Sequence, residues 1–335
     1  MEKLASYYSH TNVGLQCNLC PHYCLIAEGE SGLCKTRVRR KGILYADSYG
    51  LPCSLNVDPI EKKPFYHFLP DSKAFSLATA GCNLTCLNCQ NSSISQVSPS
   101  ETDHYFFIPK ELIELARNNK CQSIAYTYTE PTVFYEYMYD TARIAHAGGL
   151  NNVLVSNGFI NEKPLRTLCK FLDAANIDLK AFTKETYVKL IGGKLNPVKK
   201  SLEILKEEGV WLEITNLIIP GWTDDLQMIE EMCTWLVASG MQDCPLHFSR
   251  FFPTYKLSDT PPTPIETLLK AREIALNAGM RYVYLGNVPD TDLDDTVCPY
   301  CKKTLVKRRG YTVSDIGVKH CRCGYCKEEI AGIWS

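Results

Sequence analysis

From residue 74 onward, short hydrophobic runs rich in β-branched residues alternate with longer amphipathic stretches. Before a last short run, RYVYLGN, the runs predict six strands: AFSLATAG, SIAYTYTEP, NNVLVSNG, ANIDLKAF, WLEITNLIIPG and LHFSRFFP. The stretches between them predict helices; the last, PIETLLKAREIALNAG, begins with proline and ends with glycine, as helices prefer. Strands and helices that alternate in this way form βα units around a parallel sheet. We therefore predict an α/β fold, a partial (β/α)6 TIM-like barrel, rather than an open nucleotide-binding sheet, since no GxGxxG or Walker-type loop is present.

Cysteine-rich segments flank the predicted barrel on both sides. The 335 residues suffice for one large barrel and two smaller modules. We predict a Cys-rich N-terminal module over residues 1–73, the barrel over residues 74–290 and a Cys-rich C-terminal tail over residues 291–335.

Seventeen cysteines are the unusual feature of the composition. The chain is long, its start MEKLASYYSH lacks the hydrophobic core of a signal peptide, and the cysteine count is odd. Metal-binding thiolates are therefore expected rather than disulfides. Most of the cysteines fall in three clusters. The remaining five are interpreted as small buried hydrophobic residues: Cys53, Cys121, Cys169, Cys233 and Cys244.

The formal net charge of −1 gives the chain no overall field that would attract nucleic acid or anionic lipid. The basic run RVRR at residues 37–40 is interpreted as a solvated turn. No hydrophobic run approaches the length of a membrane span. We expect a cytoplasmic protein with neither a nucleic-acid nor a membrane partner.

Three cysteines with the spacing Cys82-x3-Cys86-x2-Cys89 follow the first predicted strand. The carboxyl ends of strands are where barrel enzymes place their chemistry. Three thiolates can hold three irons of a [4Fe–4S] cube and leave the fourth iron open for another ligand. The alternative is a zinc knuckle completed by a distant histidine.

The loop resembles the signature of radical S-adenosylmethionine (radical SAM) enzymes. The resemblance covers nearly the whole chain and extends to one subgroup through several motifs: CNLCPHYCLIAEGESGLC, DPIEKKPFYHF, GCNLTCLNCQNSSISQ, YTYTEPT, DLKAF and IPGWTDD. This subgroup is the radical SAM member of the AmmeMemoRadiSam system, which is associated with Memo-like and Ammecr-like proteins. It is in turn similar to pyruvate formate-lyase activating enzyme.

The resemblance implies the cofactors and the reaction type. SAM would bind the open iron of a [4Fe–4S] cluster, and reductive cleavage would yield a 5′-deoxyadenosyl radical that abstracts hydrogen from an unidentified substrate. An alternative is an activase that acts on a glycyl-radical enzyme, and a third hypothesis is a non-catalytic multi-zinc scaffold. The electron donor would be a protein such as flavodoxin or ferredoxin, and Memo-like and Ammecr-like proteins are the expected partners.

The resemblance also implies which residues at the strand ends hold SAM. Glu130 lies where the family usually has a Gly-Gly-Glu segment that contacts the SAM amino group, although Tyr128 and Thr129 replace the glycines here. Ser156 and Asn157 end the run VLVSNG and could hydrogen-bond a ribose or a carboxylate. The same residues are typical of a simple turn.

Three later strands supply the other expected SAM contacts. Asp178 and Lys180 stand two residues apart and so face the same side of a strand, and they resemble an Asp-Leu-Lys segment that contacts SAM in activating enzymes. Ile218 precedes a Pro-Gly pair in a region that packs against adenine in the family, with a plain core strand as the alternative. His247, in the run LHFSRFFP, is expected to meet the adenine.

The tail carries two Cys-x2-Cys pairs, Cys298 with Cys301 and Cys323 with Cys326. Two such pairs predict a zinc-ribbon or rubredoxin-like site with four thiolates around one ion. We expect zinc, with a single iron as the alternative, in a structural role. Cys321 is either spare or an alternative to Cys323.

The N-terminal cluster has the spacing Cys17-x2-Cys20-x3-Cys24-x9-Cys34. Four thiolates at mixed spacing fit either zinc or an auxiliary [4Fe–4S] cluster. The regular C-x2-C-x2-C-x3-C runs of ferredoxin-like insertions are absent from the sequence. We therefore favour zinc or another structural metal in this module.

Overall fold

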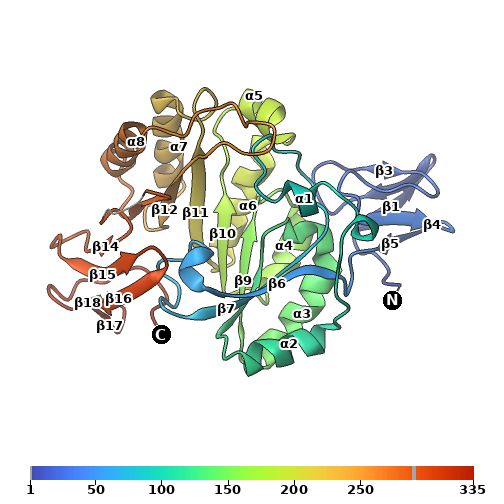
Figure 1. Cartoon of the computed structure of the whole chain (residues 1–335), viewed down its shortest axis with the longest axis horizontal. Coiled ribbons are helices and arrows are strands. Elements are labelled where there is room, and N and C mark those ends of the chain that lie inside the picture. Colours follow the sequence, from blue (N-terminus) through green and yellow to red (C-terminus); the bar gives the residue numbers. More distant parts are fainter. Residues whose placement is uncertain (1, 289–291) are drawn as a thin grey trace.

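The computed structural model describes residues 2–288 and 292–335 and has an eight-stranded sheet at its centre (Figure 1). The strands from β7 to β13 are parallel to one another, whereas β6 lies antiparallel to β7 at one edge. In spatial order they are β13 (Val283–Gly286), β12 (Leu246–Arg250), β11 (Trp211–Ile218), β10 (Ala174–Asp178), β9 (Asn151–Ser156), β8 (Ser123–Tyr126), β7 (Lys73–Thr79) and β6 (Pro52–Pro59). The prediction of an α/β fold around a parallel sheet is confirmed.

Six helices connect the parallel strands, one after each strand from β7 to β12: α2 (Pro109–Asn118), α3 (Tyr135–Ala147), α4 (Glu162–Cys169), α6 (Leu195–Glu207), α7 (Leu226–Ala238) and α8 (Ile265–Asn277). Each buries an apolar face; in α2 this face consists of Leu112, Ile113 and Ala116. The run RYVYLGN supplies β13, a seventh parallel strand after the six βα units. The sheet order has β6 and β13 as its two edges, so the barrel is open between them.

Short helical turns occupy several loops between these elements. They are η1 (Ile60–Lys62), α1 (Ser92–Ser95), η2 (Pro99–Glu101), η3 (Pro131–Phe134), α5 (Lys184–Thr186) and the π-helical η4 (Tyr187–Ile191). Of these, η4 follows β10 at the carboxyl end of the sheet and takes part in the site described below.

The N-terminal module consists of two small sheets beside the barrel (Figure 1). One contains β1 (Tyr8–Thr11), β2 (Gly14–Cys17) and β3 (Leu25–Ile26), and the other pairs β4 (Arg37–Arg40) with β5 (Ile43–Ala46). Strand β6 falls within residues 1–73 but pairs with β7 in the central sheet.

The interpretation of residues 37–40 as a solvated turn is wrong. These residues form β4, and the Arg37 side chain is buried. Its guanidinium donates to both carboxylate oxygens of Glu136 on α3, each at 3.1 Å. A buried bidentate pair of this kind ties the N-terminal module to the barrel.

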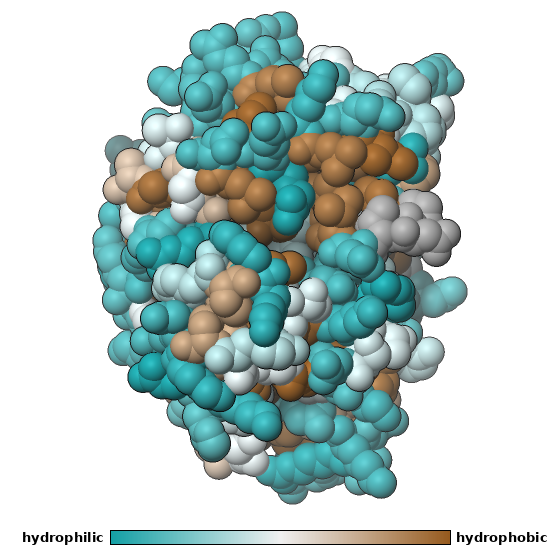
Figure 2. Space-filling model, turned by 90° about the vertical axis from the view of Figure 1, so that its left-hand side faces the viewer, coloured by the Kyte–Doolittle hydropathy of each residue, from teal (hydrophilic) through white to brown (hydrophobic). Residues whose placement is uncertain are grey.

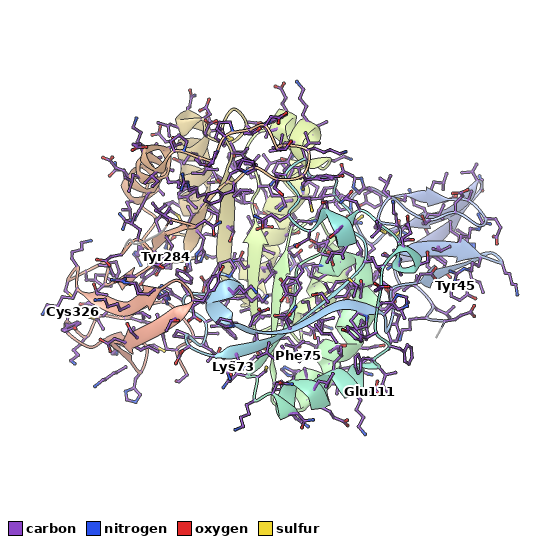
Figure 3. The ribbon with its side chains drawn as sticks, viewed as in Figure 1. Tyr45, Lys73, Phe75, Glu111, Tyr284 and Cys326 are labelled. Atoms are coloured by element: carbon purple, nitrogen blue, oxygen red, sulfur yellow. The ribbon has the colours of Figure 1, made fainter. Side chains whose placement is uncertain are left out.

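The tail is a second small module on the other side of the barrel (Figure 1). Its strands are β14 (Thr296–Val297), β15 (Thr304–Arg309), β16 (Thr312–Ile316), β17 (Val318–Lys319) and β18 (Arg322–Cys323). It packs through a hydrophobic cluster that includes Tyr66, Tyr282 and Tyr284 of the barrel side. Figure 3 shows Tyr284 where the tail meets the sheet, with Cys326 in the tail and Tyr45 in the N-terminal module at opposite sides of the molecule.

Residues around position 66 close the amino-terminal side of the barrel. Phe65 and Phe68 pack against two small side chains, those of Ala74 and Ala174. Ala74 is the second residue of β7, and Ala174 is the first residue of β10. Glu213 on β11 is fully buried and accepts hydrogen bonds from two backbone N–H groups of this segment, those of Tyr66 and His67. The opposite, carboxyl ends of the strands are left for a site.

Figure 2 shows the face of the molecule that carries α8 and the tail. Hydrophobic side chains gather in its upper half, around a hollow, whereas the lower half is mostly hydrophilic. Leu269 and Leu276 of α8 are among the exposed large hydrophobic residues. No described helix combines the length and the hydrophobicity needed to cross a bilayer.

Candidate metal and cofactor site

The three-cysteine loop follows β7, with Cys82 three residues beyond the last residue of the strand, Thr79, and wraps back on itself. The N–H of Gly81 donates to the carbonyl of Ile94, which closes the loop at 2.9 Å. Gly81 has φ +97°, and a Cβ on it would lie 2.5 Å from both the carbonyl oxygen of Cys34 and Cγ2 of Thr36. Only glycine therefore fits at the position that precedes Cys82.

The segment after β10 braces the loop from its other side. The N–H of Thr85 donates to the carbonyl of Ile191 at 3.0 Å, and the N–H of Leu87 donates to the carbonyl of Leu190 at 2.9 Å. These bonds run between the loop and η4, so the backbone that carries the cysteines is tied to the segment that follows β10. Such rigid support is what a cofactor site requires.

The spacing of the loop sulfurs suits several irons better than one ion. A single tetrahedral ion with a metal–sulfur distance of about 2.3 Å places its thiolates roughly 3.8 Å apart. Among residues 2–288 and 292–335, Cys82, Cys86 and Cys89 do not form a group with all sulfurs within 4.8 Å of one another. Each thiolate of a [4Fe–4S] cube binds a different iron, which spreads the sulfurs further apart.

Electrostatics at the loop keep the thiols protonated when no metal is bound. Burial raises the pKa of the Cys82 thiol well above its usual value, and the neighbouring Glu130 carboxylate adds to the rise. Burial also raises the pKa of Cys86, to about 11, although nearby Lys180 opposes that rise. Metal binding at these positions would therefore release protons and become stronger as the pH rises.

Glu130 organises the end of β9 next to the loop. Its Oε1 accepts hydrogen bonds from the N–H and the hydroxyl of Thr132 and from the hydroxyl of Ser156, at 2.9, 2.6 and 2.8 Å. Its Oε2 accepts one, from the N–H of Asn157 at 2.8 Å. The structure thus brings together the predicted residues Glu130, Ser156 and Asn157, with the Glu130 carboxylate as the acceptor for both of the others.

We expect Glu130→Gln to lower the free energy of unfolding by about 2–3 kcal/mol. The buried carboxylate of Glu130 accepts hydrogen bonds from N–H and O–H groups, and the side-chain amide of a glutamine would place its own N–H groups against some of these donors. Denaturant unfolding of the metal-free chain measures this change. Glu114→Gln is the matched control, since Glu114 is exposed on α2 and lies 3.9 Å from Lys110. Equal stability of the two variants would contradict the role given to the Glu130 carboxylate.

Asn83 is a residue of the site that the sequence reasoning did not single out. Its side chain is buried, donates to the carbonyl of Phe159 at 2.8 Å and accepts from Nδ2 of Asn157 at 2.9 Å. The same Nδ2 lies 4.0 Å from the sulfur of Cys82. The sequence signal was only its place between two loop cysteines, where a short polar residue equally suits a turn.

Asp178 and Lys180 meet as their spacing predicts. Lys180 Nζ donates to Asp178 Oδ2 at 2.7 Å, and the side chains are 22% and 34% exposed, respectively. Asp178 ends β10, and both groups lie close enough to Cys86 to influence its pKa. This pair is the part of the predicted SAM site that stays accessible to a ligand.

Ile218 and His247 lie in less accessible surroundings. Ile218 ends β11 and is fully buried in the core. His247, the second residue of β12, is buried, and its Nε2 donates to Oε2 of Glu213 at 2.7 Å. Its ring also stacks on Tyr284. The structure therefore places His247 with the residues that close the amino-terminal side of the barrel, away from the loop, and its contact with adenine stays a prediction.

The tail quartet has the geometry of a single-ion site. Sulfur–sulfur distances are 3.7 Å for Cys298 and Cys326 and 3.7 Å for Cys301 and Cys323. In the described part of the chain this is the one group of three or more candidate ligands whose ligand atoms all lie within 4.8 Å of one another. The distances match the roughly 3.8 Å expected around a tetrahedral ion. Cys321 is exposed and stands outside the quartet.

Comparisons with known proteins agree with this description. The model of the family described as the Radical SAM superfamily matches residues 76–236. The uncharacterized protein MJ0808 of Methanocaldococcus jannaschii is 44% identical over 318 residues, which cover 94% of this chain and 95% of that protein. The pyruvate formate-lyase 1-activating enzyme of Escherichia coli K12 is 23% identical over 149 residues, which cover 43% of this chain and 61% of that enzyme.

Solved structures are also similar in fold. The crystal structure of Streptococcus suis SuiB bound to precursor peptide SuiA superposes with a TM-score of 0.52 at 13% identity. The superposition covers 69% of this chain and 52% of that chain. At this level of identity the likeness concerns the arrangement of helices and strands.

Proposed function

Because the chain is a member of the radical SAM superfamily, an enzyme family, we propose that it abstracts a hydrogen atom from a substrate after cleaving SAM. When bound, a [4Fe–4S] cluster and SAM supply the difficult step, a one-electron reduction that gives methionine and a 5′-deoxyadenosyl radical. The observation that carries the proposal is the braced three-cysteine loop at the carboxyl end of β7, beside Glu130 and Lys180.

We assign the residues of this chain to binding and positioning. Cys82, Cys86 and Cys89 would bind three irons and leave the fourth for the amino and carboxylate groups of SAM. Asp178 and Lys180 are half-buried beside Cys86 and offer one negative and one positive group to a zwitterion.

Glu130 has a positioning role in this proposal and one remaining contact to offer. Three donors share its Oε1, whereas Oε2 accepts only from Asn157 and keeps capacity for one more donor, such as the SAM amino group. The side-chain amide of Asn157 donates to Asn83 and lies 4.0 Å from the sulfur of Cys82, and we propose that it orients this thiolate. We propose Ile218 as part of the apolar wall that keeps water from the radical.

The proposal is tested by anaerobic reconstitution with iron and sulfide, followed by dithionite and SAM. We expect 5′-deoxyadenosine to form, with methionine in equal amount, and no product when dithionite is left out. A reconstituted chain that contains the cluster yet forms no 5′-deoxyadenosine would overturn the proposal.

Similarity to the E. coli activating enzyme favours a second candidate, an activase that abstracts hydrogen from a glycine of a protein partner. This candidate predicts a glycyl-radical signal in that partner by electron paramagnetic resonance, and a small-molecule substrate predicts none. Membership of an enzyme family argues against the non-catalytic zinc scaffold. Metal analysis tests it, because a scaffold would contain zinc without iron or labile sulfide.

The remaining elements of the proposal concern partners and organisation. Radical SAM enzymes need a reductant, for which we propose a flavodoxin or ferredoxin, in the cytoplasm. Memo-like and Ammecr-like proteins are the proposed members of the same system. We also propose the division into residues 1–73, 74–290 and 291–335 as functional modules, with β6 shared between the first and the barrel.

A further inference from the structure

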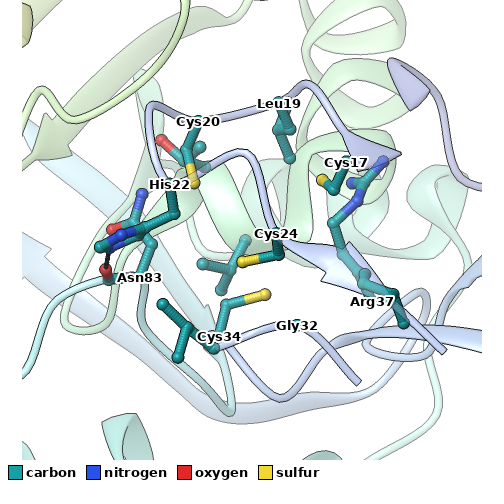
Figure 4. Close-up of a pocket in the computed structure, with 13 residues that line it drawn as sticks. Cys17, Leu19, Cys20, His22, Cys24, Gly32, Cys34, Arg37 and Asn83 are labelled. Atoms are coloured by element: carbon teal, nitrogen blue, oxygen red, sulfur yellow. Dashed lines mark hydrogen bonds between the residues drawn. The ribbon is translucent and has the colours of Figure 1, made fainter. Parts of the chain in front are cut away.

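The N-terminal cysteines line a hollow of their own beside the three-cysteine loop (Figure 4). Its empty space, including that at its mouth, is about 360 Å³. The wall is otherwise largely hydrophobic, with Leu19 and Ile26 among its residues. In Figure 4 four sulfur atoms point towards the space between them, those of Cys17, Cys20, Cys24 and Cys34.

Backbone N–H groups lie near three of these sulfurs. Those of Leu19, His22 and Leu33 lower the pKa values of the Cys17, Cys20 and Cys24 thiols, respectively, although burial has the larger effect and raises each pKa. Nearby N–H groups stabilise the charge of metal-bound thiolates. In the tail quartet, the N–H of Cys301 donates to the sulfur of Cys298 at 3.5 Å.

The two quartets differ in the spacing of their sulfurs. In the tail all four ligand atoms lie within 4.8 Å of one another, as one ion requires. Across residues 2–288 and 292–335, no three of the N-terminal sulfurs meet the same limit. Four thiolates that face one hollow at wider spacing suit four irons, each bound to one sulfur, better than one tetrahedral ion.

One buried cation lines the hollow. Arg37 is 1% exposed and lies near Cys17 and Cys34. Its bidentate pair with Glu136 holds the guanidinium in place. The pair is neutral as a whole, and of its two members only Arg37 lines the hollow.

The hollow shares a wall with the three-cysteine loop. Asn83 lines the hollow, and its carbonyl oxygen lies 2.6 Å from Nε2 of His22. The carbonyl oxygen of Cys34 lies so close to Gly81 that a Cβ at this position would be 2.5 Å from it. Gly81 directly precedes Cys82, the first loop cysteine. A group bound in the hollow would therefore neighbour the cluster of the loop.

We propose that Cys17, Cys20, Cys24 and Cys34 hold a second [4Fe–4S] cluster. This replaces the expectation of zinc in the N-terminal module. All four irons would have a cysteine ligand, so this cluster is closed to SAM, in contrast to the cluster of the loop. The site does not depend on the proposed reaction, because its iron can be counted without turnover.

The test counts iron and labile sulfide after anaerobic reconstitution and desalting. We expect about eight of each per chain in the wild type and about four sulfides in C82A/C86A/C89A, whose N-terminal quartet is intact. The variant C20A/C24A should also keep about four sulfides, in the loop. A variant that combines these five substitutions sets the background of adventitious iron, and Cys53→Ala is the matched control for a half-buried cysteine outside the clusters.

Electron paramagnetic resonance separates the two clusters. After reduction with dithionite, added SAM should leave the signal of C82A/C86A/C89A unchanged and alter that of C20A/C24A. If C82A/C86A/C89A contains no sulfide above the background and gains one zinc ion instead, the proposal is wrong. If the reconstituted wild type formed no 5′-deoxyadenosine, the proposed function would be overturned, but the counts of iron and labile sulfide would not change.

Discussion

Cys86→Ala is expected to reduce 5′-deoxyadenosine formation to background, a loss of at least about 1000-fold, because catalysis by a group that acts as a unit is lost when one member is removed. Cys86 would bind one of three irons, and its loop neighbours cannot take its place. Thr85 and Leu87, on either side of it, are tied to Ile191 and Leu190. The measurement is product formation by reconstituted variant and wild type at equal protein concentration.

The control for this prediction is Cys53→Ala. Cys53 is half-buried on β6 and lies outside the three cysteine clusters. The Cys53→Ala variant should retain activity and full iron content. If Cys86→Ala formed product at the rate of Cys53→Ala, the loop cysteines would not be the ligands of the reactive cluster.

Cys323→Ala is expected to abolish metal binding by the tail and to unfold it. Binding of structural zinc by four ligands supplies on the order of 10–16 kcal/mol in small metal-dependent modules, so the metal and the fold are lost together. Cys323 is buried, and its sulfur accepts from the N–H groups of Tyr325 and Cys326 at 3.4 Å. Metal analysis should find one ion fewer per chain, and hydrogen exchange over residues 296–326 should approach that of an unfolded segment.

Cys321→Ala is the matched control for the tail. Cys321 lies two residues before Cys323, is exposed and stands outside the quartet. The Cys321→Ala variant should therefore keep the metal ion and the slow hydrogen exchange of the tail. A tail that stayed protected in Cys323→Ala would instead show that packing against Tyr66, Tyr282 and Tyr284 is sufficient to hold it.

The sequence predicted the structure correctly where residues close together in the chain determine it. The β-branched runs became parallel strands, and RYVYLGN became β13. The spacing of Asp178 and Lys180 predicted a shared side, and their charged groups meet at 2.7 Å. The two tail pairs came together because each Cys-x2-Cys turn presents both of its sulfurs on one side.

Features that depend on residues far away in the sequence could not be predicted from it. Arg37 is buried because Glu136, on another module, accepts hydrogen bonds from two of its guanidinium nitrogens. His247 is held by Glu213, whose position on the neighbouring strand is set by register. Ligand spacing along the chain likewise does not show how far apart the sulfurs lie, so the sequence left zinc and an auxiliary cluster both open for the N-terminal quartet.

One contact of the fold also has a consequence in time. Phe68 forms a parallel bridge with Ile333, and His67 Nδ1 lies 2.6 Å from the carbonyl oxygen of Ala331, a partner 264 residues further along the chain. At about 5–20 residues per second, a ribosome needs roughly 13–53 s to add that length. The loop cysteines follow residue 67 by 15 to 22 positions, so they are synthesised early in that interval, while the amino-terminal side of the barrel still lacks its final strand contact. The cluster that we propose for the three-cysteine loop thus has a window for insertion before this backbone contact forms.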